Sequence, residues 1–265
     1  MNDLADTYRR DGVISVRVVS EADAVRHRAA LERGEEQLGA LHYIDKVHTV
    51  MTSPFELATH PAVLDVVESL IGPDILLYNS TYIIKEPGSD AFVAWHQDLT
   101  YWGLEDPEAQ VSMWLALSPV TVESGCMSMI LGSHTSGAVV HVKDATDANV
   151  LLMGQRIESV DPSDAIPYPL APGEASFHHG WTVHASAPNT STDRRIGLNV
   201  QYLAPRSRHV DGDSRTAVLV RGTDAYGHFG VDVPPESDFE PQAVSRWRAL
   251  DAAMKAGFRG DHTST

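Results

Sequence analysis

The segment VHASAPNTSTDRRIGLNVQYL, residues 183–203, has the pattern of two strands joined by a turn. A short apolar run ends near His184 and a longer one begins after Arg195, and between them lie residues of the kind that form turns. A strand that returns after such a turn would bring Arg195 back beside His184. The segment therefore predicts a β architecture with polar side chains gathered on neighbouring strands.

Other short runs of β-branched or aromatic residues are bounded by Gly, Pro, Ser or Asp, which is typical of strands in a sandwich or barrel. They are DILLYNSTYIIKEPG (74–88), VSMWLALSPVTV (111–122), GCMSMIL (125–131), GEASFHHG (173–180) and IGLNVQYLA (196–204).

Helical patterns precede and follow these strands. Residues 20–41 have apolar positions at helical spacing, with Ser20 as an N-cap, and residues 59–71 begin near Pro61 and end before Gly72. Residues 241–258 are helical again. We expect one domain across 1–265: a helical N-terminal segment (1–73), a β core (about 74–205) with an insertion (135–172) covering one end, and a C-terminal loop and helix (206–265).

Composition narrows the class of protein. The chain has 36 acidic and 20 basic residues, a net charge of -16, and no run of Lys or Arg, so nucleic acid and anionic membranes are not expected partners. Cys126 is the single cysteine, which fits a reducing compartment. No N-terminal signal pattern is evident, and no apolar run reaches the roughly 18 residues of a membrane helix, so we expect a cytoplasmic protein.

The stretch AWHQDLTYWG, residues 94–103, suggests a metal site. If it is a strand, His96 and Asp98 point to one face and Gln97 to the other. On this pair alone, a buried His–Asp hydrogen bond or two polar residues at a strand edge would serve equally well. A metal needs a further ligand, for which the candidates are His134, His141, His178, His179 and His184.

His184 is the favoured third ligand because of the strand that follows it, and His179 is the alternative. Two histidines and one carboxylate form the facial triad of non-haem Fe(II) oxygenases, which leaves coordination positions open. The planar guanidinium of Arg195 could grip a carboxylate there, and Ser186 could add a hydroxyl hydrogen bond.

WHQD (95–98), WLALSPVTVESGCMSMILGSH (114–134) and residues 183–203 together resemble the phytanoyl-CoA dioxygenase family of Fe(II)/2-oxoglutarate oxygenases, over about residues 75–205. The resemblance implies a mainly β fold with flanking helices around a double-stranded β-helix (a cupin-like jelly roll). It departs from the family at Ser124, where asparagine is usual. The site residues that it implies are His96, Asp98 and His184 for iron, and Arg195, Ser186, Trp114 and Asn79 for 2-oxoglutarate.

The reaction implied is hydroxylation of an unactivated C–H bond in a small polar metabolite or natural-product intermediate, using O2 and releasing succinate and CO2. Asp98, where related halogenases have Ala or Gly, favours hydroxylation over chlorination. Desaturation, cyclisation and demethylation stay open. An alternative of another class is a non-redox, cupin-like metalloprotein, either an isomerase or a binding protein, in which Arg195 and Ser186 would have no evident task.

Four residues are candidates for substrate contact. Trp102 follows the metal motif, and Arg221, in the segment 219–230, is either a counter-ion for substrate or part of a surface salt bridge with Asp224. Gln97 and His134 complete the set. A homo-oligomer is compatible with the sequence, which does not define the oligomeric state.

Overall fold

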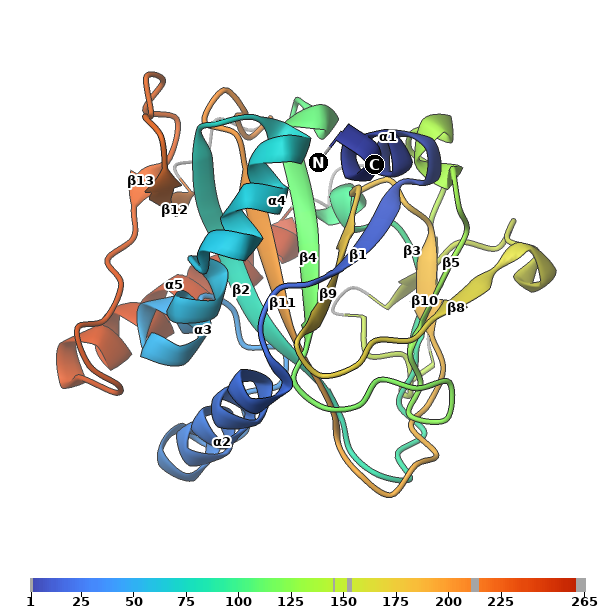
Figure 1. Ribbon diagram of the computed structural model, residues 1–265, viewed down its shortest axis with the longest axis horizontal. Coiled ribbons are helices and arrows are strands. Elements are labelled where there is room, and N and C mark those ends of the chain that lie inside the picture. The colour runs from blue at the N-terminus through green and yellow to red at the C-terminus, as the bar shows by residue number, and fades with distance from the viewer. Residues whose placement is uncertain (1, 145, 152–153, 211–214, 261–265) are drawn as a thin grey trace.

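The computed structural model describes residues 2–144, 146–151, 154–210 and 215–260 (Figure 1). Its helices are α1 (Asn2–Asp11), α2 (Glu21–Leu38), α3 (Thr52–Ala58), α4 (Pro61–Ile71) and α5 (Pro241–Gly260). Its strands are β1 (Val13–Arg17), β2 (Ile75–Lys85), β3 (Val93–His96), β4 (Gln110–Ala116), β5 (Met127–Met129), β6 (Val142–Lys143), β7 (Gln155–Arg156), β8 (Ile166–Tyr168), β9 (Glu174–His178), β10 (His184–Ser186), β11 (Arg195–Leu203), β12 (Thr216–Arg221) and β13 (Gly230–Val231).

Two sheets form the core of a double-stranded β-helix. The larger has the order β1-β9-β4-β11-β2-β12-β13, and the smaller has the order β3-β10-β5-β8. Most neighbours in each sheet are far apart in sequence, as the crossing connections of a jelly roll require. In Figure 1 the helices α2 to α5 lie on one side of the large sheet and the small sheet lies on the other.

Strand β11 shows how the sequence divides the two faces of the large sheet. Ile196, Leu198 and Val200 alternate along the strand and are fully buried in an apolar cluster with residues of α2, α3 and α4. Burial of each such side chain contributes about 1.5–3 kcal/mol. The intervening residues, Asn199 among them, face the space between the sheets. One face of the sheet thus holds the helices, and the other is free for polar chemistry.

Most elements expected from the sequence are confirmed. Ser20 caps α2 by accepting a hydrogen bond from the Asp23 amide, and α4 begins at Pro61 and ends before Gly72. All five predicted strand runs contain strands, and α5 begins at Pro241. Among the described residues, no helix has the length and apolar character needed to cross a bilayer.

Three expectations need correction. The segment after residue 205 is not only a loop and a helix, because β12 pairs with β2 and extends the large sheet. The N-terminal segment 1–73 is not only helical, because β1 pairs with β9 at the edge of the large sheet. The segment 135–172 is not only a covering loop either, since β8 pairs with β5 in the small sheet. β1 and β8 are short, and each pairs with a strand that is distant in the sequence: β9 follows β1, and β5 precedes β8.

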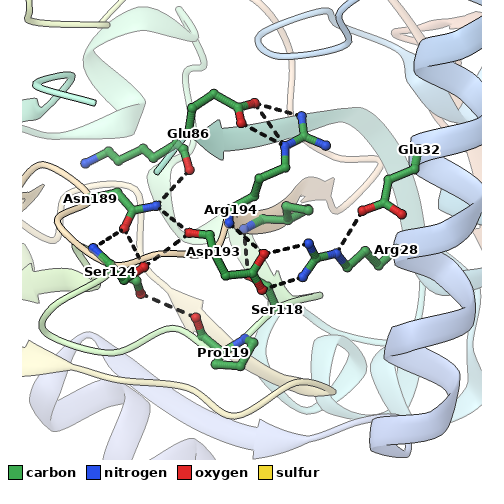
Figure 2. Close-up of polar contacts among 12 residues, drawn as sticks. Arg28, Glu32, Glu86, Ser118, Pro119, Ser124, Asn189, Asp193 and Arg194 are labelled. Atoms are coloured by element: carbon green, nitrogen blue, oxygen red, sulfur yellow. Dashed lines mark hydrogen bonds and ion pairs between the residues drawn. The ribbon is translucent and has the colours of Figure 1, made fainter. Parts of the chain in front are cut away.

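A polar network fixes the connection between β10 and β11, as Figure 2 shows. The Asn189 amide donates to the carbonyls of Lys85 (3.0 Å) and Asp193 (2.8 Å), which joins the turn to the end of β2. Arg28 of α2 donates to both carboxylate oxygens of Asp193 at 2.7 Å. The turn is therefore held from two sides, and it sets the positions of the residues just before and after it.

Candidate active site

Three potential metal ligands converge where β3 meets β10. His96 ends β3 and lies directly opposite His184 in the antiparallel pairing. The Oδ1 atom of Asp98 lies 3.4 Å from His96 Nε2 and 3.7 Å from His184 Nε2. The three ligand atoms all lie within 4.8 Å of one another, close enough to surround one ion.

The backbone reaches this arrangement differently from the sequence expectation. β3 stops at His96, and Asp98 opens a 3-10 turn, so one strand does not carry both residues. The backbone of Gln97 is nevertheless extended (φ -125, ψ 126), which keeps His96 and Asp98 on one side. His184 begins β10, whereas a strand ending at His184 was expected.

Hydrogen bonds of the two histidines prepare them for metal binding. His96 Nδ1 lies 2.9 Å from the Ala94 carbonyl, and His184 Nδ1 lies 3.0 Å from the Thr182 carbonyl. A carbonyl only accepts, so each Nδ1 carries the proton and each Nε2 lone pair faces the cluster. Burial lowers the pKa of His184 to about 3, which keeps this ring neutral. Two imidazole Nε2 atoms beside a carboxylate fit an Fe(II) ion.

Arg195 supplies a buried positive charge near this cluster. Its side chain is 1% exposed, Nη1 donates to the Gly125 carbonyl at 3.0 Å, and the guanidinium lies 5.1 Å from the Trp114 ring centroid. Burial lowers the pKa of Arg195 to about 10, so it stays charged at neutral pH. Within the described part of the chain Nε has no hydrogen-bond partner, and no carboxylate forms an ion pair with Arg195. This setting fits a ligand that brings its own carboxylate.

One cavity of about 160 Å³ joins these groups between the two sheets. The Ser186 hydroxyl lines it and accepts a hydrogen bond from Lys85 Nζ at 2.7 Å. Asn79 lines it as well, but its amide donates to Asp45 Oδ1 at 2.7 Å and its carbonyl accepts from the Lys46 amide. The sequence-predicted residues that line this cavity are His96, Asp98, His184, Arg195, Ser186, Trp114 and Asn79.

Comparison with known proteins identifies the family of this chain. The family model for phytanoyl-CoA dioxygenase (PhyH) matches residues 8–197, which include every cavity residue named above. The chain belongs to the phytanoyl-CoA dioxygenase family. Relatives in this family are named as dioxygenases, and one of them is named as alpha-ketoglutarate-dependent.

Individual relatives of this phytanoyl-CoA dioxygenase family member differ in name. A zebrafish (Danio rerio) phytanoyl-CoA dioxygenase domain-containing protein 1 is 35% identical over 53% of the chain, which spans half (50%) of that relative's length. A probable alpha-ketoglutarate-dependent hypophosphite dioxygenase of Stutzerimonas stutzeri is 26% identical over 65% of this chain and 60% of its own. The apo structure of the non-heme monooxygenase ThoJ is 31% identical, with a TM-score of 0.86 over 97% of this chain and 98% of that chain.

The four residues expected to contact substrate do not line the cavity in this family member. Trp102 is 3% exposed and packs in a separate apolar cluster with Tyr78 and Leu203. Gln97 is fully buried, and its side chain bonds to the backbone of 137, 139 and 181. The arrangement leaves neither side chain open to a substrate in this cavity.

Arg221 and His134 also lie elsewhere. Arg221, on β12, forms ion pairs with Asp65 and Glu68 of α4 and not with Asp224. His134 Nε2 lies 3.2 Å from the Arg9 carbonyl, in the packing of α1. Both side chains connect elements of the fold. Arg221 therefore forms a surface salt bridge, but with α4 and not with Asp224 as considered from the sequence.

Three further residues of the site have roles that the sequence did not indicate. His178, one of the candidate third ligands in the sequence, has Nε2 3.2 Å from Asp98 Oδ2, and Ser112 Oγ donates to the same oxygen at 2.8 Å. Tyr43 also lines the cavity, with its backbone in the left-handed region (φ 54). The strand pattern of 173–180 could have placed His178 on the inner face, but nothing in the sequence marks the strained backbone of Tyr43.

Proposed function

We propose that this chain hydroxylates a C–H bond of a small polar molecule in an Fe(II)- and 2-oxoglutarate-dependent reaction. The observation that carries this proposal is the presence, in one cavity, of the His–Asp–His cluster and of the buried Arg195 charge. Iron, when bound with 2-oxoglutarate and O2, supplies the oxidising chemistry and releases succinate and CO2. A metalloprotein without redox chemistry would have no use for the buried arginine.

Each protein group has a defined task in this proposal. His96, Asp98 and His184 hold the ion, and Arg195 binds the far carboxylate of 2-oxoglutarate with Trp114 against its guanidinium face. Ser186, fixed by Lys85, adds a hydroxyl hydrogen bond to that carboxylate. The protein contributes orientation and a partly dry cavity, in which charge-assisted hydrogen bonds are stronger than in water.

The side of the cavity formed by β2 and β11 supports a polar substrate. Asn199 and Gln201 on β11 face it next to Asn79 and Thr81 of β2, their partners in the strand register. The side chains of Asn199 and Gln201 form no hydrogen bond with other described residues. An acyl chain would leave these amides unpaired, whereas a small molecule with donors and acceptors would satisfy them.

Asp98→Ala tests the proposal. Removing the carboxylate ligand should abolish hydroxylation and bring the 2-oxoglutarate-dependent release of succinate far below the wild-type rate, because one of the three groups that would hold Fe(II) is lost. Asp90→Ala, at an exposed position in the β2–β3 connection, is the matched control and should keep the wild-type rate. Succinate release by Asp98→Ala at the wild-type rate would contradict the assignment.

The type of product separates the related reactions. Polar metabolites that stimulate succinate release would be incubated with the enzyme, and the masses of the products would be measured by mass spectrometry. A product heavier than the substrate by one oxygen atom supports hydroxylation. A product lighter by two hydrogen atoms would contradict hydroxylation and indicate desaturation or cyclisation. Stimulation by long-chain acyl thioesters and not by polar compounds would contradict the polar substrate.

A further inference from the structure

The two oxygens of the Asp98 carboxylate have different surroundings. Oδ1 faces His96 Nε2 at 3.4 Å and His184 Nε2 at 3.7 Å. Oδ2 points the other way, 2.8 Å from Ser112 Oγ and 3.2 Å from His178 Nε2. One oxygen is therefore directed at the ligand cluster, and the other is engaged by two groups of the large sheet.

The chemistry of His178 assigns its proton. An ionised carboxylate only accepts hydrogen bonds, so the His178 nitrogen that faces Asp98 must carry hydrogen. A protonated Nε2 has no lone pair for a metal, although the His178 ring centroid lies 4.9 Å from that of His184. His178 thus belongs to the site as a donor to Asp98 and not as a fourth ligand.

The two donors are held rigidly. Ser112 on β4 and His178 on β9 are directly opposite each other in the antiparallel register, and their exposed fractions are 0% and 1%. Cross-strand neighbours in the middle of a sheet have little freedom to move apart.

We infer that Ser112 and His178 are positioning residues that hold Asp98 Oδ2 and so present a single carboxylate oxygen, Oδ1, to the metal. Carboxylates bind metals through one oxygen or through two. A second oxygen from Asp98 would occupy a coordination position that the facial triad leaves open for cosubstrates. This inference rests on the proposed function, because it assumes that the cluster binds iron.

Cobalt(II) binding tests the inference without turnover. The variants are Ser112→Ala and His178→Phe, alone and together, and His178→Gln, which keeps an N–H donor. The matched control is Ser176→Ala: Ser176 lies two residues before His178 on β9, is 0% exposed, and its hydroxyl has no partner within the described residues. The readouts are the Co(II) dissociation constant and the visible ligand-field spectrum, with and without 2-oxoglutarate.

The double variant should bind Co(II) about 10–100-fold more weakly, which is the usual effect of losing groups that orient a metal ligand. Its ligand-field spectrum should change, and 2-oxoglutarate should alter that spectrum less than in the wild type. His178→Gln should recover most of both properties. Ser176→Ala should match the wild type.

A double variant with the Co(II) affinity and spectrum of Ser176→Ala would overturn the inference and leave the proposed function intact. If the double variant does not fold, Ser112→Ala alone decides, since it removes one oxygen atom: unchanged affinity and spectrum would overturn the inference. A wild-type protein that binds neither Co(II) nor Fe(II) would instead overturn the proposed function.

Discussion

Arg195 has a charge that its protein neighbours do not neutralise. Its guanidinium donates a hydrogen bond to one carbonyl oxygen and lies over the face of Trp114. A buried guanidinium normally requires a carboxylate as its partner. A cosubstrate with a carboxylate at the right distance from the metal would remove this cost only when bound. The environment of Arg195 therefore favours the binding of an anion.

Arg195→Ala should raise the 2-oxoglutarate concentration needed for half-maximal succinate release. Loss of one partner of a buried, charge-assisted pair costs about 2–5 kcal/mol, which corresponds to roughly 30-fold or more. Arg195→Lys should raise it less, because lysine keeps the charge but not the planar fork. Steady-state kinetics would measure both variants, and an unchanged 2-oxoglutarate requirement in Arg195→Ala would assign the anchor to another cation.

Lys85 gives the stability a defined pH dependence. Burial, followed by repulsion from Arg195, lowers its pKa to about 6 in the folded protein, against 10.5 in its usual state. Between these values the unfolded chain binds one more proton than the folded chain, so stability rises with pH. The free energy of unfolding rises by up to about 1.4 kcal/mol per pH unit.

Lys85→Met should remove this rise. Urea unfolding of both proteins at pH 7, 8 and 9 would measure it, as a difference in slope and not in absolute stability. Other titrating groups contribute to both proteins alike. Parallel slopes for the wild type and Lys85→Met would show that Lys85 keeps its proton in the folded state.

At the scale of elements, the connection between β10 and β11 does most to position the residues of the site. Ser186 ends β10 and Arg195 begins β11, so the turn between them sets the distance from the proposed metal ligands to Arg195, the proposed carboxylate anchor. Asn189, fully buried, fastens this turn to the Lys85 carbonyl.

Asn189→Ala should lower the free energy of unfolding by about 2–4 kcal/mol, because it leaves buried carbonyls without a donor. It should also raise the 2-oxoglutarate requirement, since both flanking residues lose their fixed positions. Ser191→Ala is the control: its hydroxyl bonds to Asn189 and Asp193 in a less buried setting, and its loss should cost under about 1 kcal/mol. Equal effects of the two substitutions would contradict this role of the turn.

The long strands could be predicted from the sequence because their composition and boundaries are local properties. β2 and β11 each combine β-branched or aromatic residues with turn residues at both ends. β1 and β8 were missed, since both are short edge strands stabilised by pairing with distant segments. The Arg221 partner was missed for the same reason, because α4 precedes it by more than a hundred residues.

Those parts of the candidate site whose geometry follows from spacing along the chain could be predicted from the sequence. The separation of His96 and Asp98 and the strand–turn–strand pattern around Arg195 are visible in the sequence. The contacts of Asp98 with Ser112 and His178 depend instead on the register of β4 and β9, which the sequence does not state. Trp102 was expected in the pocket because it follows the metal motif, but the 3-10 turn after Gln97 carries the chain into another apolar cluster.

At the scale of the whole molecule, the large sheet separates stability from chemistry. Its outer face carries the main apolar cluster with the helices, and its inner face carries Arg195, Asn199 and Gln201 toward the small sheet. The small sheet contributes His96 and His184. Two sheets that meet across a cavity therefore bring the two halves of the site together, and neither sheet holds a complete site.

An anaerobic titration of the metal-free protein with Fe(II) and 2-oxoglutarate, followed by visible absorbance, tests whether the cavity binds both together. We expect the weak charge-transfer band of the chelate to develop in the wild type and to be absent in His184→Ala, which loses one of the three ligands. His60→Ala, at the N-cap of α4, is a control that should keep the band. A folded, metal-binding wild type without the band would contradict the proposed chemistry and favour a metalloprotein without redox activity.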